Sequence, residues 1–477
     1  MRGRTIAAVV VGAALVGAAT RCVPAFVCES DAQCDLGGGG RCEAGVCRYD
    51  LVATTGVAPP TEPGNTGPDD GMSSGGLTEA SASETSETGE PAPCHKYDLP
   101  LADSGKATGV ALAADGTAYV VGVTSTDPWE LRVKRLSPTG EEVWSERVAT
   151  IEFGGMSYAD RDTDVWARVF LAGDELTVVH SQRMGMESEQ DGVYVQTFAA
   201  DDGTSRVTST ALVTADRSLR GAAAVNAGEL LIAGETDENV WYQRVTRDGD
   251  AWSAEWPEPP GFSPAGAFFS PEIAQGIAVL PGGEAMVGGT WDHGLADTDN
   301  PFRGWLRRVS AGGGKACECR REGAGILALT RGSDGALYAG GFLQTPQDMG
   351  EPQAEWWLAR TGCENDVCPV AWELHEPGPA AYTQFYRAEF VQDAIYALAP
   401  VGDGVLAGGN SDNRPLVVQI RGDKKELWRM PASSAAPKGA ALALAVAEDE
   451  RCVTIVGSVD YADYVDRKWW VRRIVLP

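Results

Sequence analysis

From Cys94 to the C-terminus, the chain repeats one pattern that few folds can accommodate. A short run of small apolar residues, as in 109–112 and 276–279, leads into a tight turn such as Asp115-Gly116. A second apolar run follows and ends at a glycine, except in one weaker copy where a histidine takes its place. These marker positions are Gly122, His180, Gly234, Gly289, Gly341, Gly409 and Gly457. Their average spacing of about 56 residues is typical of the blades of a β-propeller.

The rest of the repeat fits the same architecture. Inner strands that are sandwiched between neighbouring sheets must be small and apolar on both faces, as these runs of alanine, glycine and valine are. A third segment starts with an aromatic or apolar residue and continues with basic residues, as in 129–136. A fourth often holds a tryptophan such as Trp144. We interpret the tryptophans as packing between blades rather than stacking on a ligand.

The sequence therefore predicts an all-β fold for residues 94–477, a single β-propeller of seven four-stranded blades. The last repeat ends after its third strand, so its blade lacks an outer strand. A spare segment with strand-like alternation, residues 96–101, precedes the first blade. We predict that it pairs antiparallel with residues 469–475 and closes the ring, because an exposed third strand would favour aggregation. Pro100 suits an outermost strand, where a missing N–H donor faces solvent.

The first 20 residues have the organisation of a secretory signal peptide. Arg2 and Arg4 form a basic start, and residues 6–19 are small and apolar. Cys22 closely follows this run and is a candidate for lipid attachment, although Arg21 replaces the small residue that is typical before a lipidated cysteine. The expected location is therefore secreted, periplasmic or on the outer cell surface.

Two further segments precede the repeats. Residues 21–50 contain too little apolar surface for a core and are predicted to form a small disulfide module. Its cysteines are Cys22, Cys28, Cys34, Cys42 and Cys47. Residues 51–93 contain no lysine, arginine or aromatic residue and are rich in Thr, Ser, Pro, Gly and Glu. This composition predicts a disordered linker, because it cannot bury enough apolar surface to offset the entropy of ordering.

The charge balance restricts the partners. The chain has 67 acidic and 39 basic residues, for a net charge of -28. Such a surface repels phosphate backbones, so no nucleic-acid partner is expected, and the simplest role of the charge is solubility. No later segment is apolar enough for a membrane span, so membrane contact is expected only through the lipid anchor. We expect a monomer.

The repeat is clearest in residues 115–144, which read DGxxYVVGxTS followed by WxLRVxRLxPxGxxxW. These residues resemble secreted bacterial β-propeller repeat proteins, particularly myxobacterial surface proteins with a Cys-rich head and a Thr/Ser/Pro stalk. The resemblance covers residues 95–477, with a poor fit in residues 160–213. It implies the fold and carries over no catalytic residues.

One spacing points to a metal. Asp160, Asp162 and Asp164 alternate as the carboxylates of calcium loops do, although the expected glycine and distal glutamate are missing. They are a weak calcium candidate beside the simpler interpretation as a solvated acidic loop, and no other cofactor is expected.

The cysteines of the repeats suggest cross-links. Cys363 and Cys368 flank a short turn and are predicted to form a disulfide with each other. Cys452 is predicted to be a free thiol, while the pairing of Cys94, Cys317 and Cys319 is left open. The four histidines, at positions 95, 180, 293 and 375, share no repeat position and are interpreted as surface or turn residues.

These patterns favour a non-catalytic binding or scaffold module for a protein or a glycan. The chain contains no H-E-x-x-H motif, and residues 94–477 contain no G-x-S-x-G motif. The alternative is a glycan-active hydrolase or lyase with its site in the central channel. That alternative requires two or more carboxylates that converge on one face with perturbed pKa values.

Overall fold

A computed structural model describes most of the repeat region and little of what precedes it. The chain divides into two compact parts, residues 1–86 and 87–477. In the first part, β1 (Arg41–Glu43) and β2 (Val46–Arg48) form an antiparallel hairpin with Cys42 opposite Cys47. The predicted signal peptide, lipid-attachment site and linker lie outside the described residues. The described residues are 41–43, 46–48, 94–125, 129–151, 166–182, 192–214, 217–236, 240–256, 272–292, 302–345, 353–381, 393–412, 414–432, 438–459 and 467–477.

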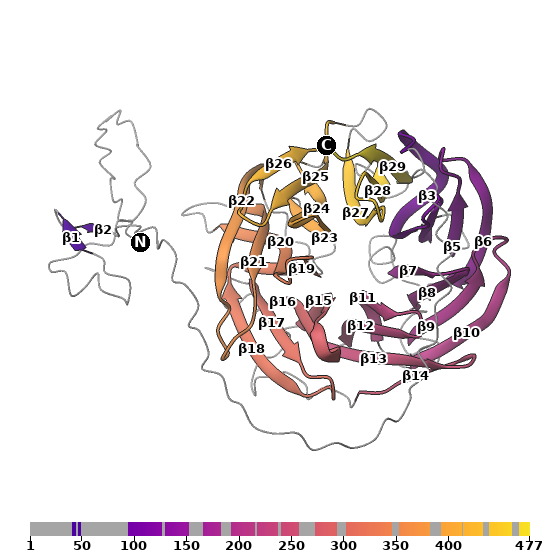
Figure 1. The fold of residues 1–477 in the computed structure, drawn as a ribbon, viewed down its shortest axis with the longest axis horizontal. Helices are drawn as coiled ribbons and strands as arrows, with labels where there is room; N and C mark the ends of the chain where they lie inside the picture. Colours follow the sequence, from indigo (N-terminus) through magenta and orange to yellow (C-terminus); the bar gives the residue numbers. More distant parts are fainter. Residues whose placement is uncertain are drawn as a thin grey trace, which may run out of the picture. The chain divides into compact units, whose positions relative to one another are not determined.

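The second part is a ring of antiparallel β-sheets (Figure 1). Its described residues include a single 3-10 turn, η2 (Pro281–Gly283), and no helix there could cross a membrane. The strands are β3 (Tyr97–Leu112), β4 (Ala118–Thr124), β5 (Trp129–Leu136), β6 (Glu142–Ile151), β7 (Ala167–Ala172), β8 (Glu175–Gln182), β9 (Gly192–Ala199), β10 (Ser205–Thr214), β11 (Arg217–Asn226), β12 (Glu229–Thr236), β13 (Val240–Asp248), β14 (Ala251–Ala254), β15 (Glu272–Val279), β16 (Ala285–Asp292), β17 (Phe302–Val309), β18 (Lys315–Glu322), β19 (Ala324–Arg331), β20 (Leu337–Thr345), β21 (Gln353–Thr361), β22 (Val370–Ala381), β23 (Ala394–Val401), β24 (Gly404–Ser411), β25 (Arg414–Arg421), β26 (Glu426–Arg429), β27 (Gly439–Val446), β28 (Cys452–Val459) and β29 (Lys468–Val475).

The described strands form blades of four. Five sheets hold four strands each, and one holds seven in the order β27-β28-β29-β3-β4-β5-β6. In that sheet β3 pairs with β29 up to Ser104 and with β4 from Gly105 onward, so two blades share one long strand. We number the blades in chain order. Blade 1 starts with the second half of β3, blades 2 to 6 start with β7, β11, β15, β19 and β23, and blade 7 comprises β27, β28, β29 and the first half of β3.

The ring is closed by the two ends of the second part. Each blade's first strand contacts that of the next blade, and β27 of blade 7 contacts β3. The predicted closing segment is confirmed, since Pro100 lies opposite Trp470 and Tyr97 lies opposite Arg473 in an antiparallel register. Pro100 therefore occupies the outermost strand of blade 7, as its missing N–H donor requires.

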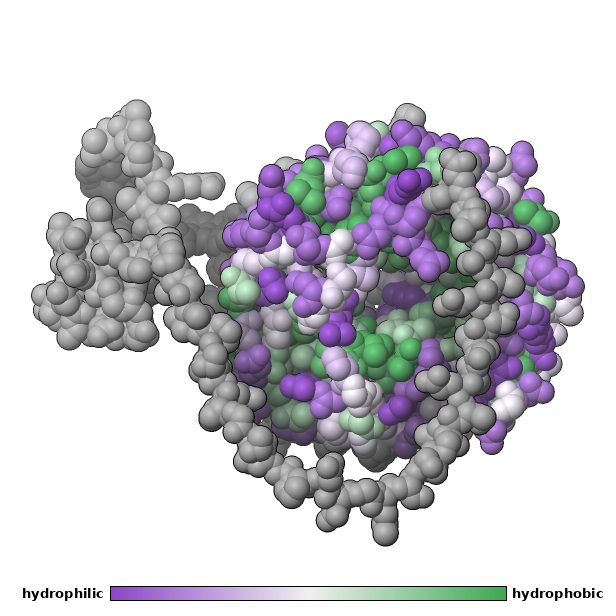
Figure 2. Space-filling view, in the orientation of Figure 1, coloured by the Kyte–Doolittle hydropathy of each residue, from purple (hydrophilic) through white to green (hydrophobic). Residues whose placement is uncertain are grey.

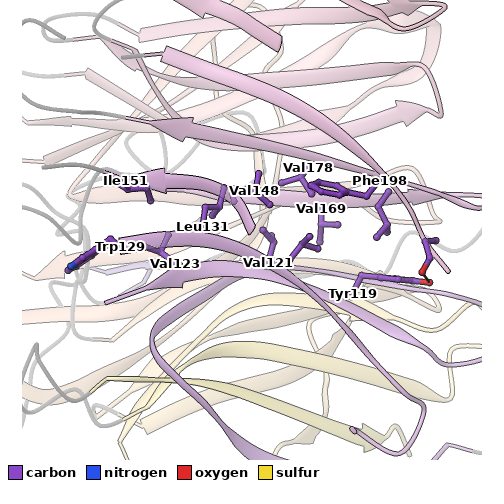
Figure 3. Close-up of a cluster of buried hydrophobic side chains, with 14 residues drawn as sticks. Tyr119, Val121, Val123, Trp129, Leu131, Val148, Ile151, Val169, Val178 and Phe198 are labelled. Atoms are coloured by element: carbon purple, nitrogen blue, oxygen red, sulfur yellow. Dashed lines mark hydrogen bonds between the residues drawn. The ribbon is translucent and has the colours of Figure 1, made fainter. Parts of the chain in front are cut away.

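The core lies between the blades. One cluster joins Tyr119, Val121 and Leu131 of blade 1 to Val178 and Phe198 of blade 2 (Figure 3). Burying each such side chain stabilises the fold by about 1.5–3 kcal/mol. The tryptophans serve the same purpose, as predicted. Trp241, Trp356 and Trp469 are almost fully buried, and Trp469 of blade 7 also donates a hydrogen bond to the Val123 carbonyl of blade 1.

The marker glycines have a physical cause. In six blades the first strand bulges opposite the marker, and the bulged strand presses a carbonyl oxygen onto the glycine. A Cβ at Gly409 would lie 1.9 Å from the Ala394 carbonyl oxygen, and one at Gly289 would lie 1.8 Å from that of Ile273. No side chain fits at such a distance, so a bulge at this point requires glycine.

Blade 2 is the one described blade whose first strand has no bulge, and this explains why its sequence repeat is weak. Its first two strands pair from Ala167↔His180 to Ala172↔Glu175 without a bulge. Space therefore exists for a side chain at the marker position, where His180 packs against the ring of Tyr194 at a centroid distance of 5.6 Å. His180 is buried, so the prediction that every histidine is a surface or turn residue was wrong at this position.

The predicted Cys363–Cys368 disulfide was also wrong. The structure joins Cys317 to Cys363 and Cys319 to Cys368, so that blade 4 is cross-linked twice to blade 5. Cys317 and Cys319 are two residues apart on β18 and share one face of the strand. The turn of blade 5 lies against that face, where the Glu318 amide donates to Asp366 Oδ1, so each cysteine of the turn meets one on β18.

Cys452 is not a free thiol. It is buried at the first residue of β28 and is bonded to Cys94. The two cysteines belong to opposite ends of the repeat region, and only the closure of the ring brings them together. Disulfides of this kind are typical of oxidising compartments.

Candidate functional site

The two ends of the ring differ in the length of their connections. In an antiparallel blade, the links between strands 1 and 2 and between strands 3 and 4 lie at one end, and all others lie at the opposite end. At the first end the links are short turns, the longest being the cross-linked residues 362–369. The strand ends at the opposite end are separated by longer stretches of sequence, as between Ile151 and Ala167, between Ala254 and Glu272, and between Ala381 and Ala394. We call this the loop-bearing end, defined by the described strand ends that lead into these long links.

Buried polar side chains gather at the loop-bearing end. Most come from the start of a first strand or the end of a second strand, and Arg467 directly precedes the third strand of blade 7. Loops on a rigid scaffold are where proteins place binding and catalytic groups, so this end is the candidate functional site. The buried polar residues here include Lys106, His180, Ser181, Ser218, Arg220, Asp393, Asn410, Ser458 and Arg467.

Arg168 lies at the innermost edge of blade 2. Its Nη1 donates to the carbonyl oxygens of Thr108 at 2.7 Å and Ala167 at 3.1 Å, and its Nη2 donates to that of Arg220 at 3.3 Å. First strands have a free edge toward the centre of the ring, so their carbonyls need donors. The guanidinium thus joins the inner edges of blades 1, 2 and 3. The Thr108 hydroxyl adds a bond to the Ala167 carbonyl oxygen at 3.0 Å.

The described residues around Arg168 carry little negative charge. Burial lowers the pKa of Arg168 to about 10, and no acidic side chain among the described residues offsets this effect. Beside it, the indole of Trp166 lies between two cations, with the Arg168 guanidinium 5.2 Å and the Lys106 ammonium 5.0 Å from the ring centroid. Arg220 on the next blade donates to the Glu235 carboxylate. The site can therefore offer a positive charge to a ligand.

On the other side of the ring the first strands are apolar. Leu327, Tyr396 and Leu442 occupy the bulge positions of blades 5, 6 and 7 and pack in one buried cluster. The centre of the ring is thus polar along blades 1 to 3 and apolar along blades 5 to 7. The space-filling view shows hydrophilic and hydrophobic residues side by side around the hollow at the centre of the ring (Figure 2).

Asp393 and Asp412 contact each other at the loop-bearing end of blade 6. Asp393 is fully buried, and its Oδ1 accepts a hydrogen bond from the Asp412 amide. Burial raises the pKa of Asp393, and the charge of Asp412 adds to this effect. Perturbed carboxyl groups of this kind are common at functional sites.

The sequence-predicted site residues are not brought into this arrangement. Asp160, Asp162 and Asp164 lie outside the described residues, as does Cys22. Among the described residues, no three His, Cys, Asp or Glu side chains are placed to hold a metal ion. His375 lies on the outer strand of blade 5, where its Nδ1 is 2.6 Å from Glu355 Oε2.

Arg168 and Asp393 were not predicted from the sequence. Arg168 could have been noticed as a charged residue in a strand position that other repeats fill with small apolar residues. Asp393 directly precedes the apolar run of blade 6 and carries no such signal.

Comparisons with known proteins find similarity among solved structures alone. No known family description matches the sequence, and no curated protein matches it. Solved structures similar to this chain include polysaccharide lyase Uly1, with a TM-score of 0.44 and 11% identity over 82% of this chain and 93% of that one. The WD40 repeats of RRP9 match with a TM-score of 0.45 and 11% sequence identity, over 80% of this chain and 99% of that one. The Dos1 propeller matches with a TM-score of 0.43 and 11% sequence identity, over 80% of this chain and 95% of that one.

The class of the protein follows from the strand pairing itself. Blades of four antiparallel strands, stacked around a centre and closed by a strand from the other end of the repeat region, define a β-propeller.

Proposed function

We propose that this chain is an exported, non-catalytic β-propeller that binds a protein or a glycan at its loop-bearing end. The observation that carries the proposal is the difference between the two ends. One end has short turns throughout, whereas the other combines long connections with buried polar side chains. A rigid ring that presents long loops on one side is an arrangement that binding proteins use repeatedly.

The cross-links fit an exported scaffold. Three disulfides among the described residues hold blade 4 to blade 5 and secure the junction of blade 7. With the signal-peptide pattern, they support a secreted, periplasmic or outer-surface location. The proposal includes a flexible linker and a Cys-rich module that precede the propeller, with Cys22 as a candidate anchor.

The test is capture of a partner by the mature chain from glycan arrays and from extracts of surface proteins. Replacing residues 258–270 at the loop-bearing end with a Gly-Ser segment of equal length should abolish capture. Replacing residues 310–314 at the opposite end in the same way should leave capture unchanged. Equal loss in both variants, or loss only in the second, would contradict the proposal.

A second candidate function is a glycan-active hydrolase or lyase, and the Asp393–Asp412 pair favours it. That mechanism needs two carboxylates on one face, and the pKa of Asp393 is raised by its burial and by the charge of Asp412. Product release from a panel of acidic and neutral polysaccharides, measured for the wild type and for Asp393→Asn, separates the two functions. Turnover that Asp393→Asn reduces at least tenfold would favour the enzyme.

A further inference from the structure

The guanidinium of Arg168 is not saturated by the bonds that hold it. Three of its five N–H groups reach backbone carbonyls, two from Nη1 and one from Nη2. This leaves Nε–H and one Nη2–H, which can lie side by side as a fork in a planar guanidinium. Among the described residues, no hydrogen bond to this pair and no ion pair to Arg168 occurs. The side chain is half-buried at the inner edge of blade 2 and keeps contact with solvent.

A fork of this kind matches the two oxygens of a carboxylate. Bidentate pairing of guanidinium with carboxylate is stronger and more directional than pairing with a point charge such as an ammonium. The three carbonyl bonds fix the orientation of the Arg168 plane, so a ligand would meet a pre-positioned fork. The lowered pKa of Arg168 agrees with a cation that lacks an anionic partner.

We propose that Arg168 anchors a carboxylate-bearing ligand at the centre of the ring, such as a uronate. This deepens the proposed function and rests on it for the biological role, but the binding of a small carboxylate stands by itself. The Lys106 ammonium lies 5.0 Å from the centroid of the adjacent Trp166 ring, so a second positive charge is close to the site. Because the net charge of the chain is -28, anions are repelled from most of its surface, so a local positive site would be where an anion binds.

Calorimetric titration of the full mature chain with glucuronate, N-acetylglutamate, sulfate and neutral glucose tests the proposal. Glucuronate should bind saturably, and glucose should not. Arg168→Lys keeps the charge and loses the fork, so it should weaken glucuronate binding at least tenfold. Because Arg168 also joins three blades, the melting temperature of each variant must be measured first. Arg307→Lys is the matched control: Arg307 is also a strand arginine, but it is buried and paired with Glu318, so binding should be unchanged.

The outcomes are distinguishable from those of the proposed function. No saturable binding of either carboxylate by the folded wild type, or equal binding by Arg168→Lys, overturns the anion site. Tighter binding of sulfate than of glucuronate also overturns the choice of carboxylate. Tighter binding of N-acetylglutamate than of glucuronate would move the ligand from a sugar to an acidic peptide side chain. If small carboxylates bind but no macromolecule is captured, the site stands and the proposed function fails.

Discussion

Cys94 and Cys452 are 358 residues apart in sequence and are bonded across the junction where the ring closes, with their Cα atoms 5.9 Å apart. Cys94 lies three residues before β3, the strand that blades 7 and 1 share, and Cys452 is the first residue of β28. The bond therefore holds the start of β3 against blade 7 at the place where the strand would begin to peel away.

The double variant Cys94→Ala/Cys452→Ala should lower the free energy of unfolding by about 3–5 kcal/mol, because the cross-link restricts an unusually long loop in the unfolded chain. Equilibrium denaturation under non-reducing conditions measures this change. The variant should still fold, since the β3–β29 pairing remains. A change below about 0.5 kcal/mol would show that the bond adds nothing to the hydrogen-bonded closure.

The marker glycines should be intolerant of any side chain. Gly409→Ala should destabilise the protein by about 2–4 kcal/mol, because its Cβ would overlap the Ala394 carbonyl oxygen across the bulge. Gly312→Ala is the matched control, since no atom lies within 4 Å of its added Cβ. Thermal denaturation of both variants checks the comparison. Equal melting temperatures would refute the role assigned to the bulge.

His180 should make the fold sensitive to acid. Burial lowers the pKa of His180 from 6.5 to about 4, so between these values the unfolded chain binds a proton that the folded chain does not. The contribution of His180 to the free energy of unfolding is therefore fully present above pH 6.5. It is lost as the pH drops toward 4, which lowers the free energy of unfolding by roughly 3 kcal/mol in total. His180→Gln should flatten this part of the pH profile, whereas substitution of the exposed His95 should not. Parallel profiles for wild type and His180→Gln would contradict the assignment.

The sequence was most informative where one physical requirement recurs. The bulge requires glycine in six blades, so the repeat could be recognised from residues such as Gly289 and Gly341 without a structure. Ring closure could be predicted because the last repeat lacks a strand and residues 96–101 supply one. The disulfides could not be predicted, because Cys317 and Cys319 pair with cysteines of a neighbouring blade and no local sequence pattern indicates that contact. Arg168 was missed for a related reason: its partners are backbone carbonyls on three blades, and carbonyls carry no sequence signal.

The ring is closed by one strand, β3, whose first half pairs with β29 of blade 7 and whose second half pairs with β4 of blade 1. The direct test of this closure is the melting temperature of the mature chain after deletion of residues 95–101, compared with deletion of residues 22–90. Loss of the closing half of β3 exposes the edge of β29, so the first deletion should lower the melting temperature by several degrees and cause aggregation. The second deletion should do neither. Unchanged melting after the first deletion, or equal loss after both, would contradict closure by this strand.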